Sequence, residues 1–200
     1  MDDNAARIID RELDPGEELL WAGRPRQGVV FTRLDFFLIP FSLLWGGFAI
    51  AWETIVLLHG VWPFAIFGSF FVVIGLYMMI GRFFVAARKR AHTYYGLTNE
   101  RVLIISGKRL DKVQSKRLKQ LDEFDLEERR DGNGTIEMGR DSSSFGMSSG
   151  YADAGWPMAG KNSPPRFAFV DNVRDVYQQI RAARRALETG DEAGSKKAEW

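Results

Sequence analysis

Two uncharged stretches decide how this chain folds: FFLIPFSLLWGGFAIAW at residues 36–52 and WPFAIFGSFFVVIGLYMMI at residues 62–80. As helices rising about 1.5 Å per residue, they are roughly 26 Å and 28 Å long, against a bilayer hydrocarbon core of about 30 Å. Neither stretch alternates polar and apolar faces as a surface helix of a soluble protein does. The sequence therefore predicts a transmembrane helical hairpin over residues 34–87, with spans at about 36–52 and 62–80.

Charges around the two stretches predict the orientation of the hairpin. The link at residues 53–61 contains no Lys or Arg, which is typical of a short external turn. Trp52 and Trp62 lie at the predicted outer boundary, where an indole keeps its ring apolar and its N–H wet. The flanking basic residues are Arg24, Arg26 and Arg33 before the first span and Arg82, Arg88, Lys89 and Arg90 after the second. We therefore expect a multi-pass protein of the cytoplasmic (inner) membrane with both termini cytoplasmic.

Few residues inside the hairpin suggest more than helix packing. Gly47 and Ala51 are four apart, as are Ala65 and Ser69, and such small pairs let two helix backbones approach closely. A transport pathway needs several polar groups facing a cavity, and the spans carry few. We expect Glu53 to be a boundary residue beside the turn rather than a proton-relay carboxylate.

Overall composition excludes several classes of protein. The chain has 200 residues, and 27 Lys and Arg balance 26 Asp and Glu at a net charge of +1, which argues against a nucleic-acid partner. The absence of cysteine excludes disulfides, thiolate metal sites and a cysteine nucleophile. Only two histidines, His59 and His92, are present, with no phosphate loop, nucleophile elbow or metal-ligand cluster. We expect no enzyme, and hence no catalytic residue, cofactor or metal site.

Two groups of residues contain side chains of the types that catalyse reactions. Ser142, Ser143 and Ser144 belong to a low-complexity run without a paired base. A cluster of five acidic residues is compatible with a catalytic pair of carboxylates, but their alternation along the sequence favours the solvated face of a strand. Its members are Asp122, Glu123, Asp125, Glu127 and Glu128.

After residue 88 the pattern changes to short alternating runs with turn signals, typical of small antiparallel strands. The predicted strands cover residues 92–98, 101–106, 110–118, 121–126, 135–139 and 166–170. Apolar residues at three- and four-residue spacing from Val173 to Leu187 then predict an amphipathic helix that covers the sheet, capped by Asp171 or Asn172. The fold class is therefore an α+β membrane protein: a two-helix hairpin followed by an antiparallel β-barrel or sheet with a C-terminal helix.

This pattern divides the chain into four parts. We expect an N-terminal cytoplasmic segment at 1–33, the hairpin at 34–87, a cytoplasmic domain at 88–188 and a disordered tail at 189–200. Within the domain, the Ser- and Gly-rich residues 140–165 predict a long mobile loop. The apolar residues Tyr151, Trp156 and Met158 inside this loop predict that it packs on something: the sheet first, and otherwise a partner or the membrane surface.

Two segments resemble a known family. Tyr95-Gly96-Leu97-Thr98-Asn99-Glu100-Arg101-Val102-Leu103-Ile104 is similar to the opening hairpin of the bacterial PH-domain (pleckstrin-homology-like) membrane proteins. Leu13-Asp14-Pro15-Gly16-Glu17-Glu18-Leu19-Leu20-Trp21-Ala22-Gly23-Arg24-Pro25 resembles the segment before their transmembrane hairpin. Gly134-Thr135-Ile136 and the Phe169–Val173 entry into a helix bearing Val176-Tyr177 are also similar. The resemblance implies a PH-like barrel at the membrane and no catalytic residue set, and the Ser/Gly-rich loop departs from it.

The leading functional expectation is a non-enzymatic, membrane-anchored PH-like module that recruits a protein partner, self-associates or contacts anionic lipid head groups. PH-like barrels elsewhere bind acidic lipids through basic residues near the first hairpin. This chain has an equivalent basic patch, which a solvated strand and turn would explain equally well. Its members are Lys108, Arg109, Lys112, Lys116, Arg117 and Lys119. The alternative is an accessory subunit of a membrane transport or secretion complex, whose larger subunits the hairpin would contact.

Overall fold

The computed structural model describes residues 1–121, 124–139, 147–156 and 165–198. The chain divides into two compact units, each built from separate stretches of sequence. The first, which we call the sheet unit, comprises residues 1–27, 89–142 and 163–200, and the second, the hairpin unit, comprises residues 28–88 and 143–162. We expected residues 1–33 to be a separate segment, whereas residues 1–27 belong to the sheet unit.

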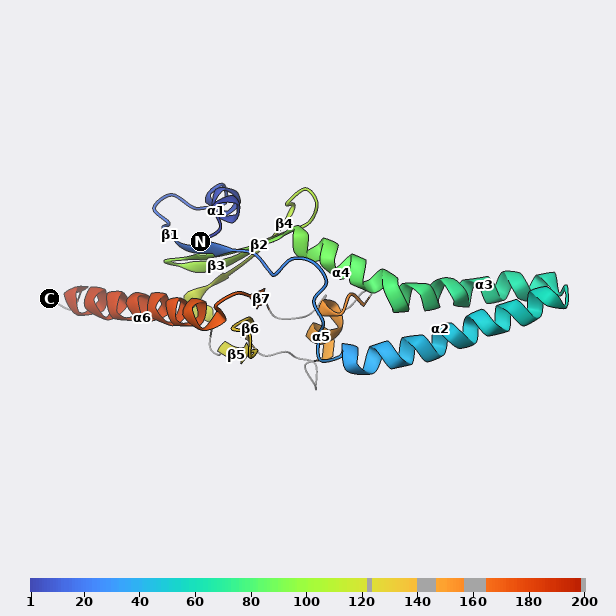
Figure 1. Ribbon diagram of the computed structural model, residues 1–200. Helices are drawn as coiled ribbons and strands as arrows, with labels where there is room; N and C mark the ends of the chain where they lie inside the picture. The colour runs from blue at the N-terminus through green and yellow to red at the C-terminus, as the bar shows by residue number, and fades with distance from the viewer. Residues whose placement is uncertain (122–123, 140–146, 157–164, 199–200) are drawn as a thin grey trace. The chain divides into compact units, whose positions relative to one another are not determined.

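The sheet unit contains two antiparallel sheets (Figure 1). The four-stranded sheet has the order β1 (Leu19–Gly23), β2 (Thr93–Thr98), β3 (Arg101–Ser106) and β4 (Lys112–Arg117). The three-stranded sheet has the order β5 (Phe124–Glu128), β6 (Gly134–Met138) and β7 (Arg166–Val170). Both sheets are open in the described residues, so the expected barrel is not closed.

One hydrophobic core fills the space between the two sheets and the C-terminal helix α6 (Val173–Ala198). The stacked rings of Tyr95 and Phe167, 4.7 Å apart between centroids, join the sheets within it. The Tyr95 hydroxyl also donates to Ala168 O at 3.3 Å and accepts from Ala168 N–H at 3.1 Å. Apolar residues of α6 close the core at the helix spacing predicted from the sequence: Val173, Val176, Ile180 and Ala183.

The N-terminal segment supplies elements that the strand pattern did not predict. Helix α1 (Asp3–Asp10) places Ile9 against the other face of the four-stranded sheet, in a small cluster with Leu103 and Ile105. Gly96 permits this contact, because a Cβ there would lie 2.7 Å from the Ile9 side chain. At the other end of the chain, α6 continues to Ala198, whereas we expected a disordered tail from residue 189.

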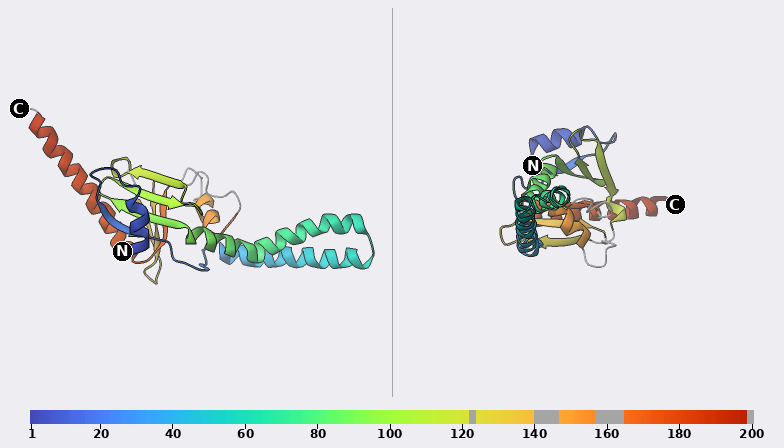
Figure 2. Two further views of the ribbon diagram at one scale, coloured as in Figure 1. Left: turned by 90° about the horizontal axis from the view of Figure 1, so that it is seen from above. Right: turned by 90° about the vertical axis from the view of Figure 1, so that its right-hand side faces the viewer.

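In the hairpin unit, α2 (Asp35–Leu58) and α3 (Trp62–Leu76) lie side by side and antiparallel (Figures 1 and 2). A π-helical turn, Tyr77–Gly81, continues α3 into α4 (Arg82–Ala91). The stretches Asp35–Leu58 and Trp62–Ala91 are long and apolar enough to cross a membrane. Helix α2 therefore runs six residues past the predicted end at residue 52, which shortens the link between the helices.

The two helices approach most closely at two glycines, Gly46 and Gly75, that lie outside the predicted small-residue pairs. A Cβ on Gly75 would lie 2.9 Å from the Gly46 Cα, so the two backbones approach closely at this point. Gly47 and Ala51 are exposed, and Gly47 has no atom within 4 Å of a would-be Cβ. The expectation for the Gly47 and Ala51 pair is wrong, because a helix that is apolar all round carries no polar face to reveal which stripe meets its partner.

The Ser/Gly-rich segment contains a helix where we expected a loop. Helix α5 (Met147–Asp153) and the turn after it pack on the hairpin within the same unit. Tyr151 and Trp156 contact each other edge to face, with ring centroids 5.9 Å apart. Gly155 lies so close to Arg82 that a Cβ would meet the Arg82 carbonyl. Tyr151 and Trp156, which we expected against the sheet, belong to the hairpin unit, and Met158 lies outside the described residues.

Candidate functional site

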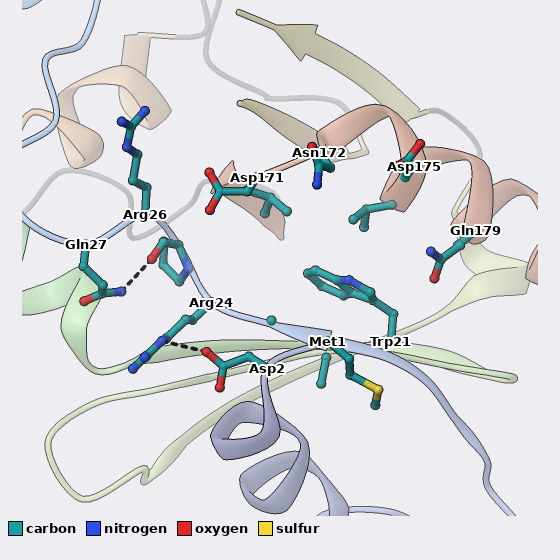
Figure 3. Close-up of a pocket in the computed structure, with 15 residues that line it drawn as sticks. Met1, Asp2, Trp21, Arg24, Arg26, Gln27, Asp171, Asn172, Asp175 and Gln179 are labelled. Carbon is teal, nitrogen blue, oxygen red and sulfur yellow. Dashed lines mark hydrogen bonds and ion pairs between the residues drawn. The ribbon is translucent and has the colours of Figure 1, made fainter. Parts of the chain in front are cut away.

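A groove of about 580 Å³ lies in the sheet unit between β1 and the start of α6 (Figure 3). The Trp21 indole forms its floor, and Asn172 and Gln179 of the α6 side face it across the groove. Neither β1 nor β7 has a second neighbouring strand among the described residues, so the groove follows the seam at which the two sheets stay apart. At one end the seam is fastened by the Arg26 N–H, which donates to Phe169 O at 2.8 Å.

Packing holds the Trp21 side chain in place. Its ring lies 5.7 Å from that of Phe167, so one side of the indole belongs to the core while the other lines the groove. Gly23, two residues further along the same face of β1, makes room for the ring, because a Cβ there would lie 2.5 Å from the Trp21 Cζ2. The floor of the groove is therefore a rigid aromatic surface.

The rim of the groove beside α6 has an unusual backbone. Phe169 and Asn172 have φ angles of +54° and +50°, in a region that side-chain-bearing residues seldom adopt. The pairing of β6 with β7 shifts between Gly134 and Ile136, which marks a bulge at Ala168 and Phe169 of β7, opposite Thr135 of β6. The bulge turns Phe169 toward the guanidinium groups of Arg90 and Arg129, which lie 5.6 and 5.1 Å from its ring centre. Residues 169–172 are thus held in one conformation by their surroundings.

The two arginines of the groove are already paired with acidic side chains. Arg24 Nε lies 2.9 Å from Asp2 Oδ2, and Arg26 Nη1 lies 2.9 Å from Asp131 Oδ2. Hydrogen bonds from the backbone N–H of Ala5, together with the charge of Arg24, outweigh burial and lower the pKa of Asp2. Asn133 in turn donates to Asp131 and lowers the pKa of that carboxyl. Both acids are therefore ionised at neutral pH.

Two further carboxylates on the groove, Asp171 and Asp175, form no ion pair with the described residues. Both side chains are exposed, at the beginning of α6. The charge that remains uncompensated among the side chains of the groove is therefore negative, while the amides of Asn172 and Gln179 supply neutral donors and acceptors.

The six predicted basic residues do not converge on a pocket. Lys108 and Arg109 lie in the turn before β4, and the others follow along β4 and the 3₁₀ turn Leu118–Gln120. Neighbours alternate between the two faces of the strand: Lys116 lies opposite Val102, and Arg117 lies opposite Arg101. All but the half-buried Lys116 are exposed, so the structure shows a basic edge strand rather than an enclosed phosphate site.

A buried carboxylate joins the N-terminal segment to the β2–β3 turn. Glu17 accepts from Thr98 Oγ1 at 2.6 Å and from Arg101 Nε and Nη2 at 2.9 and 2.8 Å. Burial by itself raises the pKa of Glu17, but hydrogen bonds from Arg101, Thr98 and the Asp14 N–H, and the charge of Arg101, lower it to about 2. This cluster fastens the strand that carries Trp21, and the sequence pattern gave no sign of it beyond the two resembling segments that it joins.

Polar groups within the hairpin unit occupy two places. Arg82 is buried at the end of the π turn, paired with Asp35, and its Nε donates to Met78 O at 2.9 Å. Glu53 lies inside α2, and its Oε2 is buried against Gly68 without a hydrogen-bond partner among the described residues. Glu53 therefore lies within α2 rather than in the link after it, and its side chain belongs to the contact between α2 and α3.

The residues weighed for catalysis do not assemble in the described part of the chain. No group of three or more His, Asp or Glu there could hold a metal ion. Asp125 and Glu127 are exposed on β5, on the solvated face that the alternation predicted, and the Glu128 carboxylate pairs with Arg174. Asp122, Glu123 and Ser142–Ser144 lie outside the described residues. His59 is exposed, with its Nδ1 2.8 Å from Ile55 O.

Comparison of the chain with models of protein families, with curated proteins and with solved structures finds no match.

Proposed function

We propose that this protein is a membrane-anchored binding module whose PH-like sheet unit, at the cytoplasmic face, recruits a protein partner without catalysing a reaction. The observation that carries the proposal is the interruption of the sheet unit by the hairpin. The chain leaves that unit after Gln27, just past β1, and returns at Lys89, just before β2. A folded unit with its own core thus contains, between two neighbouring strands, a pair of helices whose large apolar side chains are mostly exposed.

Exposure of these side chains supports the membrane anchor. In water such a surface would be unfavourable, since burying a large apolar side chain stabilises a fold by roughly 1.5–3 kcal/mol relative to leaving it exposed. A bilayer removes this cost, and backbone hydrogen bonds within the helices satisfy the polar groups that lipid cannot. Basic residues at the ends of the hairpin favour a multi-pass arrangement in the inner membrane with both termini in the cytoplasm.

Strand order supports the PH-like interpretation. A four-stranded and a three-stranded antiparallel sheet, followed by one C-terminal helix, agree with the fold that the resemblance implies. The two resembling segments also contact each other: the Asn99 N–H donates to Glu18 O at 3.1 Å, and the Glu18 N–H donates to Asn99 Oδ1 at 3.0 Å. The Trp21 groove is the concave surface of this unit on which we place the partner.

Because the chain contains no cysteine, single cysteines can test the anchor and its orientation. Arg11→Cys and His59→Cys change exposed positions in the sheet unit and in the link between α2 and α3. With a membrane-impermeant maleimide on intact cells, we expect labelling of the cysteine at 59, and of that at 11 only after permeabilisation. Release of the chain by alkaline carbonate, or equal labelling of both sites, would contradict the anchored arrangement.

The partner is tested by cross-linking the full-length protein in membranes. We expect a stoichiometric protein to be captured by the wild type and lost with Gln179→Ala, which alters the rim of the groove at an exposed position. Gln114→Ala, exposed on β4, is the matched control. Equal capture by both variants would place recruitment outside the groove.

A cleft in the hairpin unit favours a second candidate, the accessory subunit of a membrane complex. The cleft measures about 310 Å³, is almost entirely apolar and is lined by six aromatic rings with Ala49 and Gly68: Trp45, Phe48, Trp52, Phe64, Phe67 and Phe71. A transmembrane helix of a larger subunit would fit against such a surface. Co-purification in mild detergent that Phe67→Ala abolishes and Gln179→Ala leaves intact would support this candidate over the groove.

A further inference from the structure

Taking the proposed function as its basis, we infer that the Trp21 groove binds an extended segment of the partner protein that places a Lys or Arg side chain beside Asp171 and over the Trp21 indole. The ligand class is therefore a linear basic peptide.

The shape and lining of the groove favour an extended backbone. It lies between β1, the last strand of its sheet, and the first turns of α6. Outward-facing groups of an edge strand can pair with a further strand, and here one of them, Ala22 O, already accepts from the Asp2 N–H at 3.1 Å. On the opposite wall the side-chain amides of Asn172 and Gln179 can each donate to and accept from a peptide group.

The charges that line the groove favour a basic side chain on the bound peptide. Arg24 and Arg26 are neutralised by Asp2 and Asp131, whereas Asp171 and Asp175 have no such partner among the described residues. A phosphate or carboxylate ligand would meet these two acids, and both arginines of the groove are already paired with Asp2 and Asp131. A Lys or Arg side chain instead gains an ion pair with Asp171 and a cation–π contact with the face of the Trp21 ring.

Preorganisation strengthens the argument. The indole is packed against Phe167, and the left-handed residues Phe169 and Asn172 flank Asp171 on the bulged rim. The ring and the carboxylate are thus held by the fold before any ligand arrives, so binding does not have to order them.

The test uses the full-length protein in detergent and two arrays of nonapeptides that are randomised except at the fifth position. One array carries Lys or Arg at that position and the other carries Glu. We expect the protein to be retained by members of the basic array and at least tenfold less by the acidic one, with retention falling as salt rises. Asp171→Asn should weaken retention about tenfold, and Gln179→Ala should weaken it as well.

Asp125→Asn, an exposed carboxylate on β5, is the matched control and should leave retention unchanged. Asp171 and Gln179 are exposed, so their substitution does not remove a core contact as Trp21→Ala would. Equal retention on the two arrays would contradict the preference for a basic side chain. No retention on either array would contradict the binding of an extended peptide. If neither array binds while Gln179→Ala still abolishes partner capture, this inference fails and the proposed function stands; if capture is also unaffected, both fail.

Discussion

The guanidinium of Arg82 and the carboxylate of Asp35 form a buried ion pair that joins the two ends of the hairpin. Only 1% of the Arg82 side chain and 3% of the Asp35 side chain are exposed. Thr32 caps the same carboxylate, with its backbone N–H and hydroxyl 2.5 and 2.9 Å from Asp35 Oδ2. The π turn Tyr77–Gly81 immediately precedes Arg82, and π turns are common where a helix serves a specific function.

Removing one partner of this pair should damage the hairpin unit. Arg82→Ala leaves the Asp35 carboxylate buried without its cation, a change that typically costs about 3–5 kcal/mol. We expect lower resistance to SDS-induced unfolding and faster hydrogen exchange around Gly155, whose carbonyl accepts from the Tyr77 hydroxyl at 2.7 Å. Arg88→Ala, at an exposed position, is the control.

Replacing both partners separates the pair from simple loss of packing. Asp35→Leu with Arg82→Met substitutes apolar side chains of similar size, and such replacements are often neutral. We expect the double variant to recover most of the stability that Arg82→Ala loses. A double variant as unstable as Arg82→Ala would show that the charges themselves are required.

The low pKa of Glu17 should make the sheet unit sensitive to acid. Because this carboxyl has a pKa of about 2 when folded, against 4.5 as the reference value for the unfolded chain, its contribution is complete above about pH 4.5 and falls as the pH approaches 2. At about 1.4 kcal/mol per pKa unit, the contribution is about 3 kcal/mol at neutral pH. Thermal unfolding in detergent should show the loss between pH 5 and pH 2, as expected for a group of this kind.

Glu17→Gln provides the comparison. This variant should be less stable at pH 7 and should lose less stability than the wild type on acidification, since no carboxylate remains to be protonated. Glu18→Gln, at the exposed neighbouring position, should follow the wild type. A wild-type profile that Glu17→Gln reproduces over the whole range would mean that other acids cause the acid sensitivity.

The glycine contact in the hairpin offers a sharp packing test. Gly75→Leu should force α2 and α3 apart at Gly46 and lower the stability of the hairpin in an SDS titration by about 1–3 kcal/mol, as overpacking does. Gly47→Leu is the matched control, because nothing lies within 4 Å of its would-be Cβ. If the two leucine variants unfold alike, the close approach at Gly75 is not required for the hairpin.

The sequence pattern predicted elements whose signal is local. The strands at 101–106 and 166–170 agree with β3 and β7, because alternation and turn residues mark both ends. Strand β1 was missed, because its sequence LLWAG does not alternate and its partner β2 follows about seventy residues later, after the hairpin. The Trp21 groove was missed for the same reason: β1 and α6 meet only through the tertiary fold.

The basic residues of β4 and the turn before it allow a test of lipid binding that is independent of the Trp21 groove. Each exposed basic side chain near an anionic leaflet contributes about 1 kcal/mol to binding. We therefore expect a triple variant to bind phosphatidylserine-coated beads well over tenfold more weakly than the wild type when both are solubilised in detergent, most strongly at low salt. The triple variant carries Lys108→Glu, Arg109→Glu and Lys112→Glu. The matched control changes three exposed arginines elsewhere by the same charge: Arg130→Glu, Arg181→Glu and Arg185→Glu. If the β4 variant loses retention and the control does not, the strand and its turn contact lipid. Equal loss in the two variants would mean that only net charge matters, and unchanged retention of the β4 variant would exclude lipid contact by this strand.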